Sequence, residues 1–273
     1  MCETITVPVA RPALALPLAS SAFMAIVLFA IFYPDHGMGI AFDRQFQSPT
    51  WQNWFGTDNL GRDVFSRTMA GLLLSLKIGG LASLFSGALA IIFTLFSSLN
   101  RYTQWMVALL VDMFMAIPHL LLLIIMTLAF GGGALGVIMA VALSHWPKLT
   151  RLLCEEVRSL MQCQFVQLSA QFGQPRLKIL CSHIVPFVLP HCFIGVLLMI
   201  PHALIHVAGL TFLGFGLEPT SPSIGVLLAE ASRYMLSGHW WLALFPGLTL
   251  LVVLLLLAVI GQQVVAHLQR RGY

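Results

Sequence analysis

Three histidines lie in one apolar stretch near residue 200. His191 and His202 each follow a proline, and His206 lies four residues after His202. In a helix that turns about 100° per residue, the three side chains fall within about 60° of one another. His202 and His206 have the spacing at which two imidazoles reach one metal ion, and imidazole suits nickel, zinc and copper. The pattern indicates either contact with a metal or metal chelate, or structural histidines that bridge helices through hydrogen bonds.

Asp112 is notable because it lies inside another apolar segment. It falls about 9 Å along a helix that starts near residue 106. A carboxylate at the centre of a bilayer costs roughly 2.5–3.5 kcal/mol on insertion scales, so it has to face protein or water. The two interpretations are a buried, hydrogen-bonded contact between helices and a gate or substrate contact.

The sequence contains no nucleotide-binding or hydrolase motif. The patterns G-x-x-x-x-G-K-[ST], G-x-S-x-G, H-E-x-x-H and the EF-hand loop are all absent. Ser144 and His145 are adjacent, but neighbours in a helix point about 100° apart and are expected to pair poorly. Asp58 and Asp63 flank a glycine and are predicted to cap or shape a loop. We therefore expect no enzyme activity and no cofactor bound by this chain itself.

The composition is that of a membrane protein. Of the 273 residues, 59% are apolar and only 9% are charged, whereas a soluble domain carries about 25% charged residues. A helix needs about 20 residues to cross a bilayer. An all-α integral membrane protein with six transmembrane helices is predicted, since lipid cannot satisfy free backbone groups. The expected spans are 14–33, 70–96, 106–130, 135–146 extended at its ends, 187–215 and 242–266.

Charge asymmetry predicts the orientation of these spans. Six spans place both termini on one side, together with nine basic residues: Arg11, Arg101, Lys148, Arg151, Arg158, Arg176, Lys178, Arg270 and Arg271. The opposite loops hold four: Arg44, Arg62, Arg67 and Arg233. The positive-inside rule then puts both termini in the cytosol. The net charge of +4 is interpreted through the side of the membrane on which the basic residues lie, and no nucleic-acid partner is expected.

The chain divides by this topology into three parts. Residues 1–33 are an N-terminal tail and the first span, which is too long an apolar run for a cleaved signal peptide. Residues 34–69 form a periplasmic loop. Residues 70–273 form the core, which contains a long cytosolic loop at 147–185.

The cytosolic loop has the pattern of an amphipathic helix followed by a break. Phe165, Leu168 and Phe172 recur on one helical face beside glutamines, and Gly173 ends the pattern. Such a helix lies on a lipid surface or docks into a partner protein. Because its polar face is mostly amide and not Lys/Arg-rich, we favour a protein partner.

The longest motifs resemble those of a known family. The block FGTDNLGRDVFSR occupies 55–67, and LTFLGFGL occupies 210–217. With them, the chain after about residue 50 resembles the inner-membrane permeases of binding-protein-dependent ABC importers. The similar branch is the dipeptide, oligopeptide and nickel family, second-permease ("C") type. The resemblance implies the type I importer permease fold and a multi-pass protein of the bacterial inner membrane.

The cytosolic loop matches the family's "EAA" signature in part. Gly173 and the Ile184-Val185-Pro186 triplet stand at matching positions. Gln167 replaces the usual acid, and two alanines are replaced by Leu168 and Ser169. The resemblance implies that the loop forms a coupling helix seated in an ATPase subunit. The candidate coupling residues are Phe165, Gln167, Leu168, Ser169, Gly173, Ile184 and Pro186.

The resemblance also implies the partners and the activity. A homologous second permease forms the other half of the path, and the membrane lipid surrounds both. Two ATPase subunits use ATP and Mg²⁺. A periplasmic binding protein delivers the cargo. The stretch at 202–216 is more similar to the nickel-type permeases, so nickel or a metal–chelator complex is expected. The candidate path residues are His202, His206, His191 and Asp112, with no permanent metal site because the cargo has to be released.

Two alternatives to a metal importer stay open. The first is a permease for dipeptides or oligopeptides. The second is a stand-alone secondary carrier, which should show two internally similar halves, and the sequence shows no such repeat.

Overall fold

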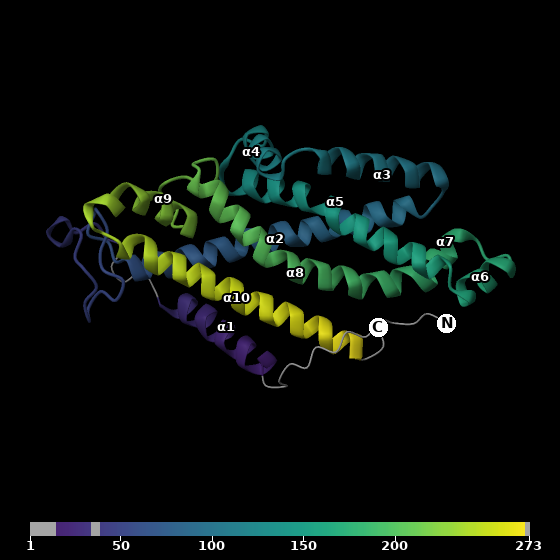
Figure 1. The fold of residues 1–273 in the computed structure, drawn as a ribbon, viewed down its shortest axis with the longest axis horizontal. Coiled ribbons are helices and arrows are strands. Elements are labelled where there is room, and N and C mark those ends of the chain that lie inside the picture. The colour runs from purple at the N-terminus through teal and green to yellow at the C-terminus, as the bar shows by residue number, and fades with distance from the viewer. Residues whose placement is uncertain (1–14, 34–38, 271–273) are drawn as a thin grey trace.

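The computed structural model describes residues 15–33 and 39–270, and in these ranges the fold is all-α (Figure 1). Its only β feature there is an isolated bridge between Thr57 and Asp63. The α-helices are α1 (Ala15–Phe32), α2 (Val64–Ser97), α3 (Arg101–Ala116), α4 (His119–Ala129), α5 (Gly133–Met161), α6 (Gln164–Gln171), α7 (Arg176–Ile179), α8 (Val185–Phe212), α9 (Ile224–Tyr234) and α10 (Trp241–Arg270).

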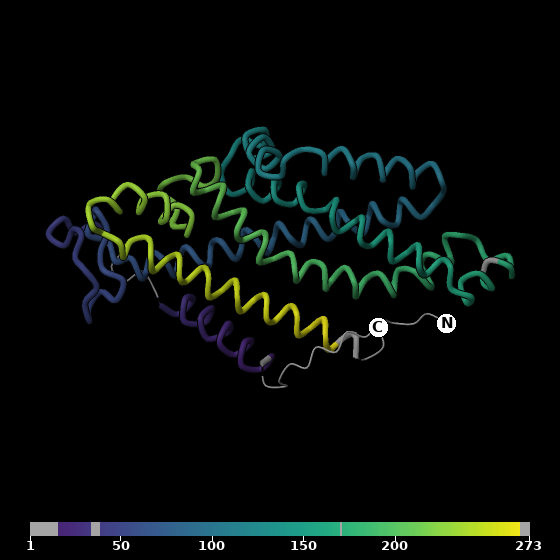
Figure 2. Tube along the Cα trace, in the orientation of Figure 1, coloured from purple at the N-terminus to yellow at the C-terminus, as the bar shows by residue number. Residues whose placement is uncertain are grey.

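The long helices run along one axis of the molecule. Figures 1 and 2 show α2, α5, α8 and α10 extending between an end that carries α9 and an end that carries α6 and α7. Helix α2 makes its most extensive contacts with α5 and α8, while α1 packs on α10. Close approach in this centre depends on small residues, since a Cβ on Gly87 would lie 2.3 Å from a methyl group of Val196.

The apolar helices account for part of the predicted topology. The described helices long and apolar enough to cross a bilayer are α2, the continuous segment Arg176–Phe212 and α10. The pair α3 and α4 adds a fourth if counted as one broken span, whereas Leu16–Phe32 in α1 is shorter. Helix α5 carries the polar residues Ser144, His145 and Lys148 in its middle. An all-helical membrane protein is therefore confirmed, while six spans stay a prediction.

The segment 106–130, which was expected to cross the bilayer, is not one straight helix. The chain bends by 98° between α3 and α4. Pro118 is the cause, because proline lacks an N–H and pushes the preceding residue out of the helical region. Ile117 accordingly has the extended angles φ −82° and ψ 134°. The bend makes His119 the first residue of α4.

The chain also remains helical where the cytosolic loop was expected to begin. Helix α5 continues through Pro147 to Met161. Its last turns carry Leu149, Leu153 and Val157, which are buried in a cluster with residues of α8. This apolar face sustains the helix to Met161, so the segment 147–185 contains the end of α5 followed by α6 and α7.

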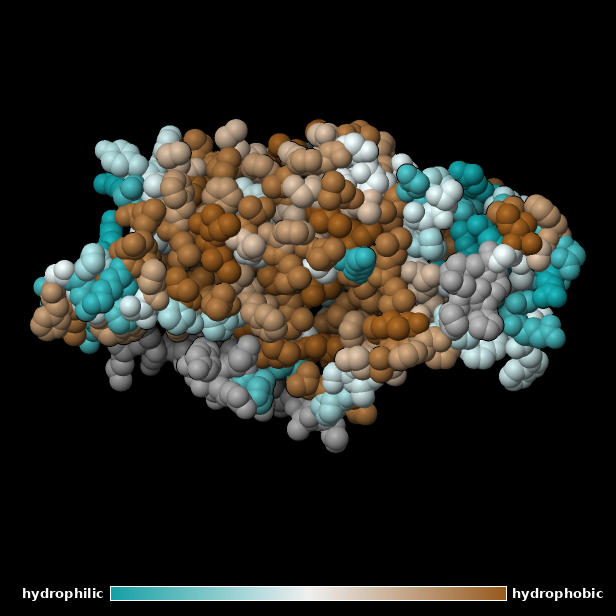
Figure 3. All heavy atoms as spheres, turned by 180° about the vertical axis from the view of Figure 1, so that it is seen from behind, coloured by the Kyte–Doolittle hydropathy of each residue, from teal (hydrophilic) through white to brown (hydrophobic). Residues whose placement is uncertain are grey.

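The molecular surface has the polarity expected of a membrane-spanning bundle. In Figure 3 a broad hydrophobic band covers the middle of the visible face, and hydrophilic residues gather at both ends of the long axis. A water-exposed bundle would place its polar residues around this middle band. The long axis is therefore the direction in which the chain crosses the bilayer.

A charged network holds together the end of the molecule near α9. Asp58 accepts hydrogen bonds from Arg62 Nε and Arg67 Nη1, each at 2.7 Å. Arg67, whose side chain is 5% exposed, also donates to both carboxylate oxygens of Glu230 at 2.7 and 3.2 Å. Asp63 caps α2 by accepting from Ser66 N at 2.8 Å. Asp58 and Asp63 are therefore structural, as expected from the sequence.

The Arg67→Lys variant should lower the free energy of unfolding by about 1.5–3 kcal/mol. Hydrogen bonds to charged groups contribute about this much, and lysine lacks the fork that reaches both acids. Thermal unfolding of the purified full-length chain measures the effect. The control Arg44→Lys alters an exposed ion pair with Asp43 and should change the stability by less than about 0.5 kcal/mol. Equal unfolding midpoints for the two variants would contradict the prediction.

Candidate functional site

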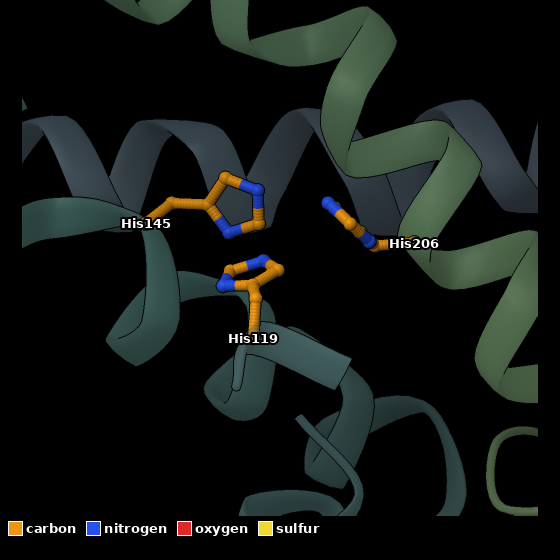
Figure 4. A group of neighbouring side chains, drawn as sticks. All are labelled: His119, His145 and His206. Carbon is orange, nitrogen blue, oxygen red and sulfur yellow. The ribbon is translucent and has the colours of Figure 1, made fainter. Parts of the chain in front are cut away.

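Three histidines from three helices point toward one another (Figure 4). His119 begins α4, His145 lies in α5 and His206 lies in α8. One ring nitrogen from each lies within 4.8 Å of the other two. The ring centroids are 4.6 to 5.1 Å apart. Imidazole groups from distant parts of the sequence thus converge at one point.

The hydrogen bonds of His145 leave its outer nitrogen available as a ligand. Its Nδ1 lies 2.9 Å from the carbonyl oxygen of Val141 and 2.9 Å from Ser144 Oγ. A carbonyl only accepts, so Nδ1 carries the proton and donates it to Val141. Nε2 then keeps its lone pair, which is the arrangement of metal-ligating histidines whose other nitrogen donates to a backbone carbonyl.

The same geometry corrects the expectation for Ser144. The hydroxyl lies within hydrogen-bond distance of His145, although neighbours in a helix were expected to pair poorly. Ser144 Oγ also donates to the Val141 carbonyl, at 3.1 Å. Because Nδ1 is protonated in this arrangement, it is no base for the hydroxyl. The pair therefore has no activated nucleophile.

His119 provides a second available nitrogen. Its Nε2 is buried and has no hydrogen-bond partner. Burying a polar group without a partner is unfavourable, and each such group calls for an explanation. A ligand held between the three rings would satisfy this nitrogen.

The three ring nitrogens lie farther apart than the nitrogens of a tetrahedral metal complex. Metal–imidazole bonds are about 2.0–2.1 Å long, which places two nitrogens of a tetrahedral complex roughly 3.3 Å apart. The three nitrogens here lie within 4.8 Å of one another. Binding an ion requires the rings to move together by about 1 Å. Three nitrogen ligands also leave a coordination position open, whereas a permanent structural zinc site is closed by four protein ligands.

The structure groups the histidines differently from the helical periodicity. His206 belongs to the group, but His191 does not, because its Nδ1 donates to the Phe187 carbonyl at 2.9 Å and its ring stacks on Phe187. His202 is exposed one turn before His206, close enough to interact with it electrostatically. Sequence reasoning missed His119 and His145. Their local signals are the Pro-His pair at 118–119 and the polar residues Ser144, His145 and Lys148 in an apolar segment.

Asp112 lies outside the histidine group. Its carboxylate forms an ion pair with Arg151, which connects α3 to α5. Both side chains are more than half exposed, Asp112 at 61% and Arg151 at 50%. The carboxylate has a charged partner, but it is not the buried helix contact that one interpretation expected.

An exposed apolar surface lies at the opposite end from α9. Helix α6 turns Val166 inward, where it is 2% exposed. Phe165, Leu168 and Phe172 are 50%, 51% and 83% exposed on the other side. The apolar stripe predicted for this segment is therefore present, and the described residues 15–33 and 39–270 leave it exposed. Large exposed apolar groups of this kind mark interaction surfaces.

The other coupling candidates shape this surface. Gly173 has φ +76°, a left-handed conformation that suits glycine and separates α6 from α7. Ser169 Oγ lies 3.2 Å from His183 Nε2, which ties α6 to the start of the next span. Gln167 is exposed and donates to the Gln162 carbonyl at 3.3 Å. Ile184 is fully buried, and Pro186 lies in the first turn of α8.

A family model covers most of the chain. Residues 79–271 match the family described as "binding-protein-dependent transport system inner membrane component". The chain belongs to this family. It is therefore the permease subunit of an ABC importer and a multi-pass protein of the bacterial inner membrane.

Named relatives of this importer permease differ in cargo. It is 33% identical over 240 residues to the nickel transport system permease protein NikC of Escherichia coli (strain K12), which covers 81% of this chain and 80% of the relative. It is 30% identical to a putative peptide permease protein of Brucella suis biovar 1 (strain 1330), covering 90% and 82%. It is 27% identical to the dipeptide permease DppC of Bacillus subtilis (strain 168), covering 88% and 75%.

Membership of this family indicates which partners and functions to consider for the histidine group and for the exposed stripe of α6. Permease subunits of ABC importers are not catalytic themselves, and the family implies ATPase subunits, a binding protein and a second permease. The relatives support a C-type permease of the peptide and nickel branch. An importer permease needs a path for its cargo and a surface for its ATPase.

Proposed function

We propose that this importer permease forms half of the translocation path for nickel or a metal–chelator complex. The observation that carries the proposal is the convergence of His119, His145 and His206 between membrane helices. Ionisable residues are rare inside membranes and mark substrate or ion pathways. A transporter has to release its cargo, and an open three-nitrogen site satisfies this requirement. His202, one turn before His206, offers a further weak contact, with Asp112 nearer the cytosolic end.

The proposed topology is the type I importer fold with six spans and both termini in the cytosol. It places α1, α2, the broken pair α3–α4, α5, α8 and α10 across the bilayer. The lengths of α2, α8 and α10 and the excess of basic residues near α6 support this arrangement. The charged network around Arg67 then faces the periplasm, where the binding protein arrives.

The exposed stripe of α6 is the proposed contact with an ATPase subunit. Phe165, Leu168 and Phe172 enter a cleft of that subunit, while Gln167 makes a neutral contact where related permeases carry an acid. ATP and Mg²⁺ act in the partner, so this chain requires no cofactor. The support is the unpartnered apolar face and the left-handed break at Gly173.

Two helices connect the coupling surface to the histidines. Helix α5 carries His145 and ends three residues before α6, and α8 carries His206 and begins after α7. Along α5 the distance from His145 to Met161 is about 24 Å at 1.5 Å per residue. A movement of α6 driven by the ATPase is thus transmitted along α5 and α8. The two helices change the spacing of the histidines and release the ion.

A permease for dipeptides or oligopeptides is the second candidate. The Brucella and Bacillus relatives are named for peptide transport and match more of this chain than NikC does. In that case the three histidines are structural and hold α4 against α5 and α8.

Deleting this chain from its host distinguishes the two cargoes. We expect accumulation of radioactive nickel at submicromolar concentration to fall to the background level, and growth on dipeptides as the nitrogen source to continue. Re-expression of the wild-type chain should restore nickel accumulation. Loss of dipeptide uptake with unchanged nickel accumulation would replace the metal cargo by a peptide.

A further inference from the structure

A cavity of about 970 Å³ lies between α3, α5 and the segment that contains α6 and α7. Its lining includes Trp105 of α3, Cys154 of α5 and Val166 of α6. Figure 1 shows the turn between α2 and α3 at the same end of the molecule as α6 and α7. In the topology proposed above this end faces the cytosol, so the cavity lies near the cytosolic surface of the membrane.

The charges that line the cavity are mainly positive. Four arginines and two carboxylates take part in the lining. Both carboxylates are already paired, Asp112 with Arg151 and Glu155 with Arg158. The other two arginines have no carboxylate partner among residues 15–33 and 39–270. The cavity therefore has an excess of positive charge that an anion can neutralise.

The two arginines without a carboxylate are Arg101, the first residue of α3, and Arg176, the first residue of α7. Arg176 Nη1 donates to the Leu99 carbonyl at 2.8 Å, which brings its guanidinium to the turn just before Arg101. This single bond leaves the other donors of the guanidinium available. A guanidinium is a planar fork whose donors match the oxygens of a phosphate group. The two arginines are therefore suited to hold a phosphate between them.

The cavity also has an apolar wall. Val107 and Val111 of α3 are buried along it. Trp105 lines the cavity one turn after Arg101 and is 66% exposed. Tryptophan is enriched at membrane–water interfaces, where its ring lies at the level of the lipid headgroups. A molecule with an anionic head and an apolar tail matches this combination of arginines and apolar side chains.

We propose that this cavity binds an anionic phospholipid of the phosphatidylglycerol type from the cytosolic leaflet. The phosphate accepts hydrogen bonds from Arg101 and Arg176, and an acyl chain lies along Val107 and Val111. Basic pockets between membrane helices on the cytosolic side bind anionic headgroups in this way. The proposal uses the orientation proposed above and is independent of the cargo.

The bound lipid would also contact the inner side of α6. Val166 lines the cavity on this side, whereas the exposed stripe that includes Leu168 lies on the other side of the helix. The lipid and the proposed ATPase contact therefore occupy different faces of α6. A lipid in the cavity connects α3 and α5 to the helix that the ATPase moves.

Native mass spectrometry of the complete importer in detergent tests this inference. The probes are phosphatidylglycerol, phosphatidylcholine with the same acyl chains, and sn-glycerol 3-phosphate, which carries the phosphate without a tail. We expect phosphatidylglycerol to bind roughly tenfold more tightly than phosphatidylcholine, whose choline cancels the negative charge. Glycerol 3-phosphate in about 100-fold excess should not displace the lipid, because it makes no contact with the apolar wall.

The Arg101→Gln variant should lower the affinity for phosphatidylglycerol about fivefold, and combining it with Arg176→Gln should lower it about 30-fold. Binding of phosphatidylcholine should change little in both. Arg101→Gln breaks no ion pair of the described residues, so it tests the site even if Arg176→Gln displaces α7. The matched control is Lys178→Gln, which removes an exposed charge from α7 that does not line the cavity. This variant should bind phosphatidylglycerol as the wild type does.

Three results would overturn the inference. The first is equal binding of the two lipids by the wild type. The second is an equal loss in Lys178→Gln and Arg101→Gln, because the lipid would then respond to basic surface charge in general. The third is displacement of phosphatidylglycerol by glycerol 3-phosphate, which would make the ligand a soluble phosphate.

Discussion

Replacing His119 and His206 together by alanine should reduce nickel uptake to the level of cells without the permease. The double variant leaves His145 as the single imidazole at the point where α4, α5 and α8 meet. Disturbing even the groups that support metal ligands typically costs 10–100-fold in affinity, and two direct ligands are lost here. We expect a decrease of at least about 100-fold in the affinity of the importer for nickel. Uptake of radioactive nickel over a concentration series measures it.

The control for this experiment is His191→Ala. His191 lies on the same helix as His206, but its ring donates to the Phe187 carbonyl and stays outside the group. Its replacement should leave uptake nearly unchanged. The double variant should also insert and assemble normally, since His119 and His206 are only partly buried. Wild-type nickel uptake by a correctly assembled double variant would make the histidines structural.

Replacing Leu168 and Phe172 by aspartate should abolish transport while leaving the chain in the membrane. Both side chains are exposed on α6, so the substitution removes no core contact. In a docked complex the same positions would bury two unpaired carboxylates, and an uncompensated buried charge costs about 3–5 kcal/mol. Two such charges should weaken ATPase binding by more than about 1,000-fold.

Copurification of the ATPase subunits with the tagged permease and cargo-stimulated ATP hydrolysis measure this loss. The conservative pair Leu168→Met and Phe172→Leu keeps the surface apolar and should retain both signals. Full ATPase binding by the aspartate variant would exclude this face of α6 as the docking surface.

Local sequence patterns were sufficient to predict the apolar stripe of α6. The i, i+3, i+7 spacing of Phe165, Leu168 and Phe172 predicted an apolar stripe, and the stripe is present and exposed. Gly173 was expected to end the helix, and it has the left-handed φ of +76° that ends one. These features depend on residues within two turns of one another, so their periodicity appears directly in the sequence.

Helix boundaries were predicted less well at prolines that lie in segments whose other residues favour a helix. Pro118 and Pro147 both lie in helix-compatible segments, yet the chain bends sharply at the first and continues through the second. At Pro147 the following turns bury Leu149 and Leu153 against α8 and sustain the helix. The outcome at each proline depends on packing with a neighbouring helix.

The sequence by itself determined the class of this protein, its helical membrane character, its family and the apolar stripe of α6. Composition, helical period and motif spacing are properties of single segments, and each can be measured without knowing which helices touch. Only the tertiary structure decided that His206 meets His119 and His145. Periodicity shows which side of one helix a residue occupies, but not which other helix packs there. The bend at Pro118 and the close packing of α5 and α8 bring these residues together.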